Sequence, residues 1–203
     1  MRLYVIGGTG RTGHHLVDQA IARGHDVTAL VRRENSLAPQ AHLQLIMGDA
    51  SRPEDVAAFL DGHDAVLSCL GHRFHDDTHL LEDAADALLD AMACTGVNRC
   101  LFVSQGLLFA SRNPLRTLLR RVMAARVEDS TAMEHLLELS DTDWTIVRPP
   151  RLRDGGAPHG YKARAGALPD GPASLERADL AAFMLDAVEY HQYPRAIVGV
   201  TSA

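Results

Sequence analysis

A glycine-rich turn near the start of the chain constrains its fold more than any other feature. The apolar run at residues 3–6 gives way to Gly-Gly-Thr-Gly-Arg-Thr-Gly at residues 7–13. Apolar residues then return at positions 16, 17, 20 and 21, which is the spacing of one helix face. This order predicts a strand, a tight turn and a helix. Such a turn presents unpaired N–H groups at the positive end of the helix dipole, where phosphate groups bind.

The three spaced glycines each have a separate predicted role. Gly7 permits the tight turn after the strand, Gly10 lets the main chain approach a pyrophosphate, and Gly13 lets the helix pack closely on the sheet. We therefore predict a dinucleotide site; the alternative is a glycine loop that serves only as a turn between strand and helix. The residues predicted to hold the diphosphate are Gly7, Thr9, Gly10, Arg11, Thr12 and Gly13.

Strands and helices alternate along the rest of the chain. Further strands are predicted at 25–31, 43–47, 64–70, 99–104, 144–147 and 197–200, separated by helices at 51–60, 78–95, 114–139 and 175–190. This order predicts an α/β fold with a doubly wound parallel sheet, the Rossmann fold, and ligands beyond the carboxyl ends of the strands. A chain of 203 residues suits one such domain, 1–203, and is too short for a separate substrate domain.

Local signals add expectations that a structure can check. A capping box, Ser51-x-x-Glu54, predicts the start of the second helix, and Ser174 is predicted to cap the last one. Cys69 and Cys100 fall in predicted strands and are expected to be buried. With Cys94 they make an odd number whose spacing suits neither a zinc site nor a disulfide framework.

The helical stretch 114–139 combines an apolar stripe with a basic one. We expect the basic stripe to be a solvated helix face, with contact to a nucleic acid or an anionic membrane as the alternative. The residues predicted to point inward are Leu115, Leu118, Leu119, Val122 and Met123, and the arginines recur at Arg112, Arg116 and Arg120.

The net charge of −6 and the pI near 6.0 argue against nucleic acid as the main partner. The sequence has no apolar run of eighteen residues, and it opens on a strand rather than a signal peptide. These observations predict a soluble cytoplasmic protein, a monomer or weak dimer, with no membrane partner and no metal.

The end of the second strand is where a dinucleotide fold selects its cofactor. An acidic residue there holds the ribose 2′-hydroxyl of NAD, whereas arginine accommodates the 2′-phosphate of NADP. Arg32 and Arg33 occupy this place and predict NADP(H), while Glu34 leaves NAD(H) as an alternative. After the third strand, Asp49, followed by Ala50, either accepts a hydrogen bond from the adenine or helps to cap the next helix.

Three later strand ends are predicted to reach the same edge of the sheet. They deliver Leu70 and Gly71, then Ser104 and Gln105, and finally Pro149, Pro150 and Arg151. Residues 151–172 follow as a long stretch rich in Gly and Pro, with a short strand-like piece near Tyr161. Because long loops inside compact domains usually bind something, we interpret 151–172 as a substrate lid.

These motifs together resemble the branch of atypical short-chain dehydrogenases/reductases that contains biliverdin-IXβ reductase, or NADPH-dependent flavin reductase, and grades into NmrA-like NAD(P)-binding proteins. The resemblance covers almost the whole chain. It implies NADP along the strand ends, with Arg32 at the 2′-phosphate, Asp49 by the adenine, and Leu70, Gly71, Ser104 and the prolines at the nicotinamide. The matching segments are 7–13, Leu30-Val31-Arg32, Gly48-Asp49, Asp64-Ala65-Val66, Leu70-Gly71, Pro149-Pro150, Asp179-Leu180 and Phe183-Met184-Leu185.

The chain departs from that pattern where proton transfer is concerned. Gln105 stands where the branch has a serine, Arg151 stands where it has a histidine, and no tyrosine is followed four residues later by lysine. Without that pair, reduction of a simple carbonyl is disfavoured, whereas a conjugated acceptor delocalises charge and takes its proton from solvent. We predict an NADPH-dependent reductase of a flavin, quinone or tetrapyrrole, positioned by Ser104, Gln105 and Arg151. The alternative is a catalytically silent NAD(P)-sensing regulator.

The stretch 72–79 contains three histidines, His72, His75 and His79, with Asp76 and Asp77 among them. A polar loop is the simplest interpretation of this stretch. A proton-donating His72 or His75 in the active-site crevice is the main alternative, and a metal site is a weaker one because nothing fixes the turn that would bring the ligands together.

Overall fold

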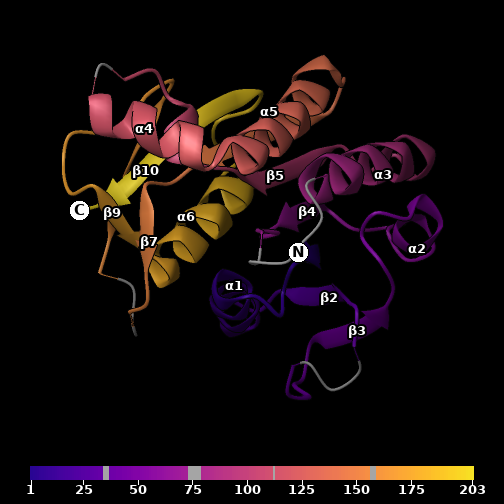
Figure 1. Cartoon of the computed structure of the whole chain (residues 1–203). Coiled ribbons are helices and arrows are strands. Elements are labelled where there is room, and N and C mark those ends of the chain that lie inside the picture. Colours follow the sequence, from indigo (N-terminus) through magenta and orange to yellow (C-terminus); the bar gives the residue numbers. More distant parts are fainter. Residues whose placement is uncertain (34–36, 73–78, 112, 156–158) are drawn as a thin grey trace.

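An eight-stranded sheet runs through the molecule in the order β3-β2-β1-β4-β5-β6-β10-β8 (Figure 1). The computed structural model describes all residues except 34–36, 73–78, 112 and 156–158. The strands of this sheet are β1 (Arg2–Ile6), β2 (Asp26–Val31), β3 (Leu43–Met47), β4 (Ala65–Ser68), β5 (Arg99–Val103), β6 (Asp143–Arg148), β10 (Ala196–Ser202) and β8 (Tyr161–Ala165).

All strand pairs in this sheet are parallel except the pair at one edge. Leu3 of β1 lies opposite Val27 of β2 on one side and Ala65 of β4 on the other. The edge strand β8 runs antiparallel to β10. The predicted doubly wound Rossmann topology is confirmed, and its strand order 3-2-1-4-5-6 is the one that binds dinucleotides.

The segment predicted as a lid contributes to two sheets. Its strand β8 is the antiparallel edge of the main sheet, which the prediction of a parallel sheet did not include. Its first residues form β7 (Arg151–Arg153), which pairs in parallel with β9 (Ser174–Glu176) in a separate two-stranded sheet. Backbone pairing therefore holds the first residues and the middle of the segment.

Helices cover both faces of the main sheet. On one face α1 (Arg11–Ala22) packs against α6 (Arg177–Glu189), and on the other α3 (Leu80–Thr95) packs between α2 (Pro53–Ala57) and α5 (Ala124–Leu139). The short 3-10 helix η1 (Gly106–Leu108) and helix α4 (Pro114–Val122) lie between β5 and α5 in the chain. Among the described residues, no helix combines the length and the apolar character needed to cross a bilayer.

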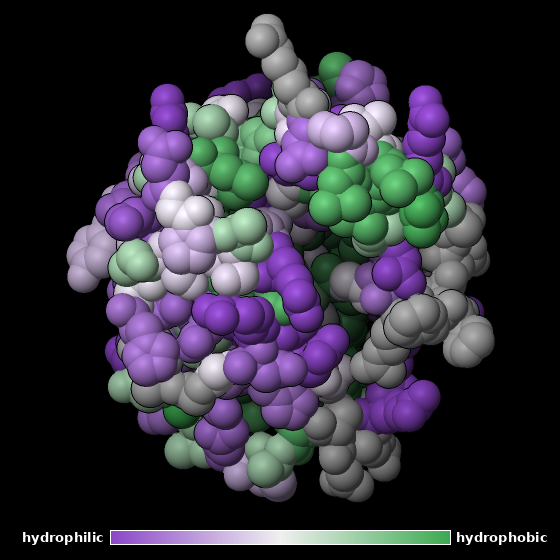
Figure 2. Space-filling model, turned by 60° about the vertical axis from the view of Figure 1, so that its left-hand side comes forward, coloured by the Kyte–Doolittle hydropathy of each residue, from purple (hydrophilic) through white to green (hydrophobic). Residues whose placement is uncertain are grey.

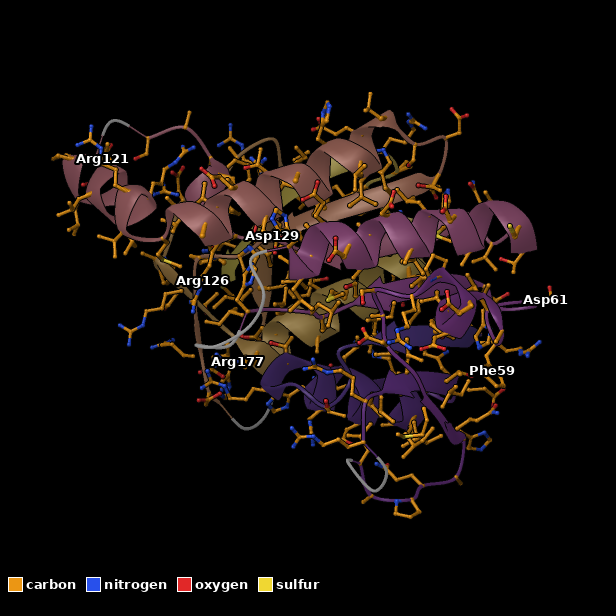
Figure 3. The ribbon with its side chains drawn as sticks, turned by 45° about the vertical axis from the view of Figure 1, so that its right-hand side comes forward. Phe59, Asp61, Arg121, Arg126, Asp129 and Arg177 are labelled. Carbon is orange, nitrogen blue, oxygen red and sulfur yellow. The ribbon has the colours of Figure 1, made fainter. Side chains whose placement is uncertain are left out.

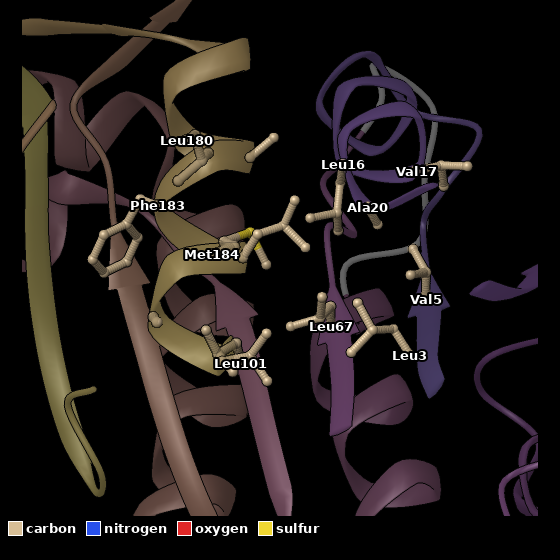
Figure 4. Packing of buried hydrophobic residues seen from close by; sticks show 14 of the residues in the cluster. Leu3, Val5, Leu16, Val17, Ala20, Leu67, Leu101, Leu180, Phe183 and Met184 are labelled. Atoms are coloured by element: carbon tan, nitrogen blue, oxygen red, sulfur yellow. The ribbon is translucent and has the colours of Figure 1, made fainter. Parts of the chain in front are cut away.

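The core lies in two layers because successive residues of a strand point to opposite faces of the sheet. Leu3 and Val5 of β1 pack under α1 and α6, whereas Tyr4 and Ile6 pack under α2 and α3. Figure 4 shows the first layer, in which Leu16 of α1 and other buried side chains fill the space above the sheet. Strands buried on both faces explain the nearly continuous apolar runs in the sequence.

Both predicted helix caps are wrong. Helix α2 begins at Pro53, and its N-cap residue Arg52 makes no side-chain cap bond. The hydroxyl of Ser51, the predicted cap, donates to Asp49 instead. Proline is well suited to the first helical position but disfavours helix at the residue before it, which moves the start past Ser51. Ser174 lies in strand β9, three residues before α6 begins.

The predicted inward stripe between 114 and 139 is also wrong for its first half. The helix breaks at Met123 into α4 and α5, and the apolar side chains of α4 point to solvent. A helical period indicates which side chains share a face, but only the tertiary arrangement decides where that face points. Cys100 is buried in β5 as predicted, whereas Cys69 follows β4 and is only partly buried.

Candidate functional site

A cavity of about 450 Å³ lies at the carboxyl ends of the central strands. This is the size range of small-molecule sites. The predicted site residues that line it are Gly7, Thr9, Gly10, Arg11, Thr12, Arg32, Asp49, Ala50, Leu70, Gly71 and Ser104. His72, considered as a proton donor in the crevice, lines it as well. The other lining residues were not among the predicted site residues: Ile6, Leu30, Val31, Gly48, Cys69, Leu80, Val103, Leu152 and Arg177.

The glycine turn has the geometry that a phosphate-binding loop needs. Gly7 has φ of 77°, which disfavours other residues, and its carbonyl accepts a hydrogen bond from the Gly10 amide at 2.9 Å. A Cβ on Gly13 would stand 2.2 Å from the Gly7 carbonyl oxygen, so only glycine allows this approach of helix and turn. A Cβ on Gly10 would meet only that same oxygen, at 3.2 Å, and is otherwise in open space.

The N-terminus of α1 is available to an anion. Its N-cap residue is Gly10, no side chain caps its amides, and no acidic residue stands in its first turn; the structure describes this helix in full. The positive end of the helix dipole therefore faces the cavity without a protein partner of opposite charge at the cap. Gly13 is absent from the cavity lining, which agrees with its packing role.

The end of the cavity at β2 and β3 carries opposite charges. Arg32 is exposed and lines the cavity, whereas Arg33 is exposed but does not line it. Asp49 accepts hydrogen bonds from the backbone N–H of Ser51 at 3.1 Å and from its hydroxyl at 2.9 Å. These bonds, the backbone one foremost, lower the pKa of Asp49, so the carboxylate stays charged beside the cavity. Glu34, the residue that favours NAD, lies outside the described residues.

At the opposite end of the cavity, Ser104 belongs to a buried polar network. Its hydroxyl donates to Oε1 of Glu134 on α5, and the guanidinium of Arg148 donates to both oxygens of the same carboxylate. The side chain of Glu134 is only 5% exposed. Because the Ser104 proton is held by Glu134, the hydroxyl oxygen presents lone pairs rather than a proton to any other partner.

Gln105, Pro149, Pro150 and Arg151 do not line the cavity. The side-chain amide of Gln105 donates to the carbonyl of Arg126 and to the hydroxyl of Ser130, so its two protons are directed into α5. The carbonyl of Pro149 accepts from the amide of Gly106 at 2.7 Å. The prolines therefore shape the backbone near the cavity without lining it.

Arg151 is exposed on strand β7, and its neighbour Leu152 lines the cavity in its place. Side chains alternate between the two faces of a strand, so only one of two consecutive residues can point to the cavity. Leu152 is apolar and packs on the core layer under α1 and α6, which fixes the direction of both residues.

His72 and Asp129 form a pair at the cavity that the sequence reasoning identified only in part. Nε2 of His72 lies 3.0 Å from Oδ2 of Asp129, and neither side chain is more than 10% exposed. Asp129 also accepts the backbone N–H bonds of Leu81 and Glu82, which caps α3 from helix α5. Figure 3 shows Asp129 on α5 beside the start of α3. His75, Asp76 and Asp77, also considered for this site, lie outside the described residues.

Arg177 is a second group without a sequence signal. It is 9% exposed at the start of α6, lines the cavity, and donates to Asp154 at 2.7 Å (Figure 3). Burial lowers the pKa of its guanidinium. Arg11 approaches the other oxygen of Asp154 at 3.3 Å. Arg11 and Arg177 together place two cations next to the glycine turn.

Cys69 lines the cavity but is not suited to nucleophilic chemistry. Burial raises the pKa of its thiol to about 12, and its Sγ lies 3.7 Å from the sulfur of Met184. A thiol that remains protonated at neutral pH is a weak nucleophile. Cys69 therefore acts as a small apolar group in the cavity wall.

Comparisons with known proteins agree with this geometry. A family model described as NAD(P)H-binding matches residues 7–191. The photosystem II assembly factor Ycf39 of Trieres chinensis is 36% identical over 109 residues, 51% of this chain and 34% of that protein, so this chain spans about a third of its length. The uncharacterized protein YwnB of Bacillus subtilis is 27% identical over 207 residues, 95% of this chain and 94% of that protein.

A solved structure from Streptococcus pneumoniae, of a protein provisionally described as an NADH-flavin reductase, matches the full length of both chains. The TM-score is 0.82 and the sequence identity is 25%. Because the NAD(P)H-binding model covers most of the chain and the Rossmann fold matches throughout, this protein belongs to the NAD(P)H-binding family.

Proposed function

We propose that this protein is an NADPH-dependent reductase that passes a hydride to a flavin or a similar planar conjugated acceptor, a quinone or a tetrapyrrole. The observation that carries the proposal is the uncapped N-terminus of α1, which faces a cavity bordered by Arg32 at one end and Ser104 at the other. We assign the chain to the atypical short-chain dehydrogenase/reductase type, acting in the cytoplasm.

The residues of the cavity fit an adenine dinucleotide phosphate along its length. The turn from Gly7 to Thr12, with Arg177 nearby, offers amides and positive charge to the diphosphate. Arg32 is placed to hold the 2′-phosphate, and the charged Asp49 is placed to accept a hydrogen bond from the adenine. Leu70, Gly71 and Ser104 are left to border the nicotinamide.

The main contribution of the protein to this reaction is to position the cofactor and the acceptor. When bound, NADPH supplies the hydride. Ser104 offers an acceptor oxygen to the nicotinamide end, since Glu134 and Arg148 fix its hydroxyl. His72, paired with Asp129 at the cavity wall, is the group we assign to proton supply when solvent does not provide it. Residues 151–172 are the proposed lid over the acceptor, and Leu152 is its contact with the cavity.

One observation favours a second function, that of a catalytically silent NAD(P)-sensing regulator of the NmrA-like type. Two of the three residues predicted to act on an acceptor do not line the cavity, because Gln105 bonds to α5 and Arg151 is exposed on β7. A protein with this arrangement binds the cofactor but leaves the acceptor without those polar partners. Its output is then an interaction with another protein rather than a product.

One experiment separates the two functions. Purified protein is mixed with NADPH and, in turn, with FMN, riboflavin, a quinone and biliverdin, and loss of the reduced nicotinamide is followed by absorbance. We expect many turnovers per protein molecule with at least one of these acceptors. Tight NADPH binding in calorimetry without turnover on any acceptor contradicts the reductase and supports the regulator. A His72→Gln variant tests the proton source, since it should change the pH profile of kcat more than the KM for NADPH.

A further inference from the structure

Helix α4 turns an apolar stripe toward solvent. Leu115, Leu118, Leu119 and Val122 follow the three- and four-residue spacing of one helix face, and they are 69%, 58%, 43% and 75% exposed. None of the nine residues of α4, all of them described, is buried. Helices of globular proteins normally direct such a stripe to the core. This stripe therefore has no partner within the described part of the chain.

The polar side of the same stretch is strongly basic. Residues 112–127 include five arginines and no aspartate or glutamate, although the whole chain has a net charge of −6. Three of these arginines, Arg116, Arg120 and Arg121, line a groove of about 350 Å³ between η1, α4 and α5, together with one acidic residue, Glu128. The floor of the groove includes the apolar side chains of Leu107 and Phe109. Positive charge and apolar surface thus occur together on one side of an otherwise acidic molecule.

The figures show this side from two directions. Figure 2 brings it forward, and a green hydrophobic patch lies at its upper right beside purple hydrophilic side chains. Figure 3 labels Arg121 on α4, at the outer end of the molecule. Arg116 holds the helix in place by donating to the carbonyl of Gly106 in η1. The stripe is therefore presented by a helix that is anchored through its polar side.

We propose that α4 docks on an anionic phospholipid surface, with its leucines between the headgroups and with Arg120 and Arg121 on the lipid phosphates. A helix with a narrow apolar face and an arginine-rich polar face is typical of helices that lie in the membrane interface. Attraction between a basic segment and anionic lipids adds to the burial of the apolar stripe. The charge of this segment, opposite to that of the rest of the chain, orients the protein with α4 toward the lipid.

A second copy of the chain is a poorer occupant of this surface. A nine-residue helix is only about 14 Å long, and one face of it offers far less than the roughly 800 Å² per partner of a stable interface. Pairing the same face in two copies also brings Arg120 and Arg121 of each close to those of the other. A nucleic acid would engage the arginines but leave the leucine stripe in water.

Vesicle flotation with the full-length protein tests the proposal. Vesicles of neutral phosphatidylcholine alone are compared with vesicles that also contain phosphatidylglycerol. We expect binding only to the anionic vesicles, and weaker binding as salt screens the attraction. Arg121→Glu should lower the partition coefficient by about tenfold, because each basic residue near such a surface contributes a factor of about five and the reversal adds repulsion. Leu118→Ser should lower it by a similar factor.

Matched variants separate docking from folding. Arg195→Glu reverses a charge on the exposed loop before β10, and Leu139→Ser replaces a leucine that is 71% exposed at the end of α5. Both should bind vesicles like the wild type, and circular dichroism should give one melting curve for all four variants. Equal binding to neutral and anionic vesicles, or wild-type binding by Arg121→Glu, overturns the proposal. So does a concentration-dependent dimer in ultracentrifugation that Leu118→Ser abolishes.

Discussion

Ser104 and Glu134 are joined by a hydrogen bond between the end of β5 and the middle of α5. The carboxylate that accepts this bond also neutralises Arg148 at the end of β6, so one buried charge fixes two strand ends and a helix relative to one another. In an apolar interior an unpaired ion is costly, and the three groups therefore depend on each other. The position of Ser104 at the cavity follows from this network.

Replacing Glu134 with alanine should destabilise the protein strongly. The change leaves Arg148 charged and unpaired in an environment where it is only 14% exposed, and breaking a buried pair in this way costs about 3–5 kcal/mol. Urea titration of the free energy of unfolding checks the value. Glu138→Ala, four residues further along α5 and exposed, is the control and should change stability by less than about 0.5 kcal/mol. A similarly small loss of stability in Glu134→Ala and Glu138→Ala would contradict the proposed dependence of Arg148 and Ser104 on Glu134.

The glycine turn offers a pair of substitutions that separate folding from binding. Gly13→Ala places a methyl group 2.2 Å from the Gly7 carbonyl oxygen and 2.6 Å from the Gly8 Cα, which the backbone must move to accommodate. Overpacking of this kind costs about 1–3 kcal/mol. Gly10→Ala meets only the Gly7 oxygen at 3.2 Å and should fold nearly normally.

The added methyl of Gly10→Ala would instead occupy the space over the turn where the diphosphate is proposed to lie. We expect this variant to bind NADPH about tenfold more weakly or worse, a loss of at least about 1.4 kcal/mol, with its melting temperature little changed. Calorimetry and thermal unfolding of Gly10→Ala and Gly13→Ala together give the comparison. Unchanged NADPH affinity in a folded Gly10→Ala protein would show that the diphosphate does not bind at this turn.

Arg32 and Arg33 are consecutive arginines with different predicted effects. Only Arg32 lines the cavity, so Arg32→Ala should raise the KM for NADPH by about tenfold or more, since bonds to a charged group contribute about 1.5–3 kcal/mol. The KM for NADH, which lacks the 2′-phosphate, should change little. Arg33→Ala is the matched control. Steady-state kinetics with an active acceptor, or titration of each cofactor by calorimetry, tests whether Arg32 contacts the 2′-phosphate. Equal effects of Arg32→Ala on NADPH and NADH would argue against this contact.

Much of this architecture could be predicted from the chain itself because its strands are buried on both faces. A short apolar run such as that of β4 is typical of a strand buried on both faces of a parallel sheet. Gly96 ends α3 in the left-handed conformation that favours glycine. The packing role of Gly13 was predictable from its spacing after Gly7 and Gly10. The structure agrees, since a Cβ on Gly13 would lie 2.2 Å from the Gly7 carbonyl oxygen.

The features that sequence reasoning missed depend on where side chains point in the folded protein, which the spacing of residues along the chain does not show. The spacing of Leu118 and its neighbours identifies a helix face but not whether the body of the protein lies on that side. Arg151 and Leu152 differ by one position on a strand, and the pairing of β7 with β9 decides which of them lines the cavity. Arg177 enters the site only because α1 and α6 pack side by side, a contact between segments about 160 residues apart.

His63 should make the stability of the protein depend on pH. Its Nδ1 lies 2.9 Å from the Leu60 carbonyl, which can only accept, so this nitrogen carries the proton and Nε2 accepts from the Thr28 hydroxyl at 2.8 Å. The ring also packs edge-on against Tyr4, with centroids 5.4 Å apart. Burial lowers the pKa of His63, so the folded protein favours the neutral imidazole.

The sign of the effect follows from that lowered pKa. The unfolded chain takes up a proton near the ordinary histidine pKa of about 6.5, whereas the folded chain does so only at lower pH. The contribution of His63 is therefore complete above about pH 6.5 and is lost as the pH falls from there through the folded pKa. Urea unfolding between about pH 5 and 8 should show a flatter pH dependence for His63→Gln than for the wild type. His135→Gln, on the exposed side of α5, is the control and should keep the wild-type dependence of the unfolding free energy on pH. Parallel curves for His63→Gln and the wild type would contradict the prediction, because His63 would then titrate alike in the folded and unfolded chains.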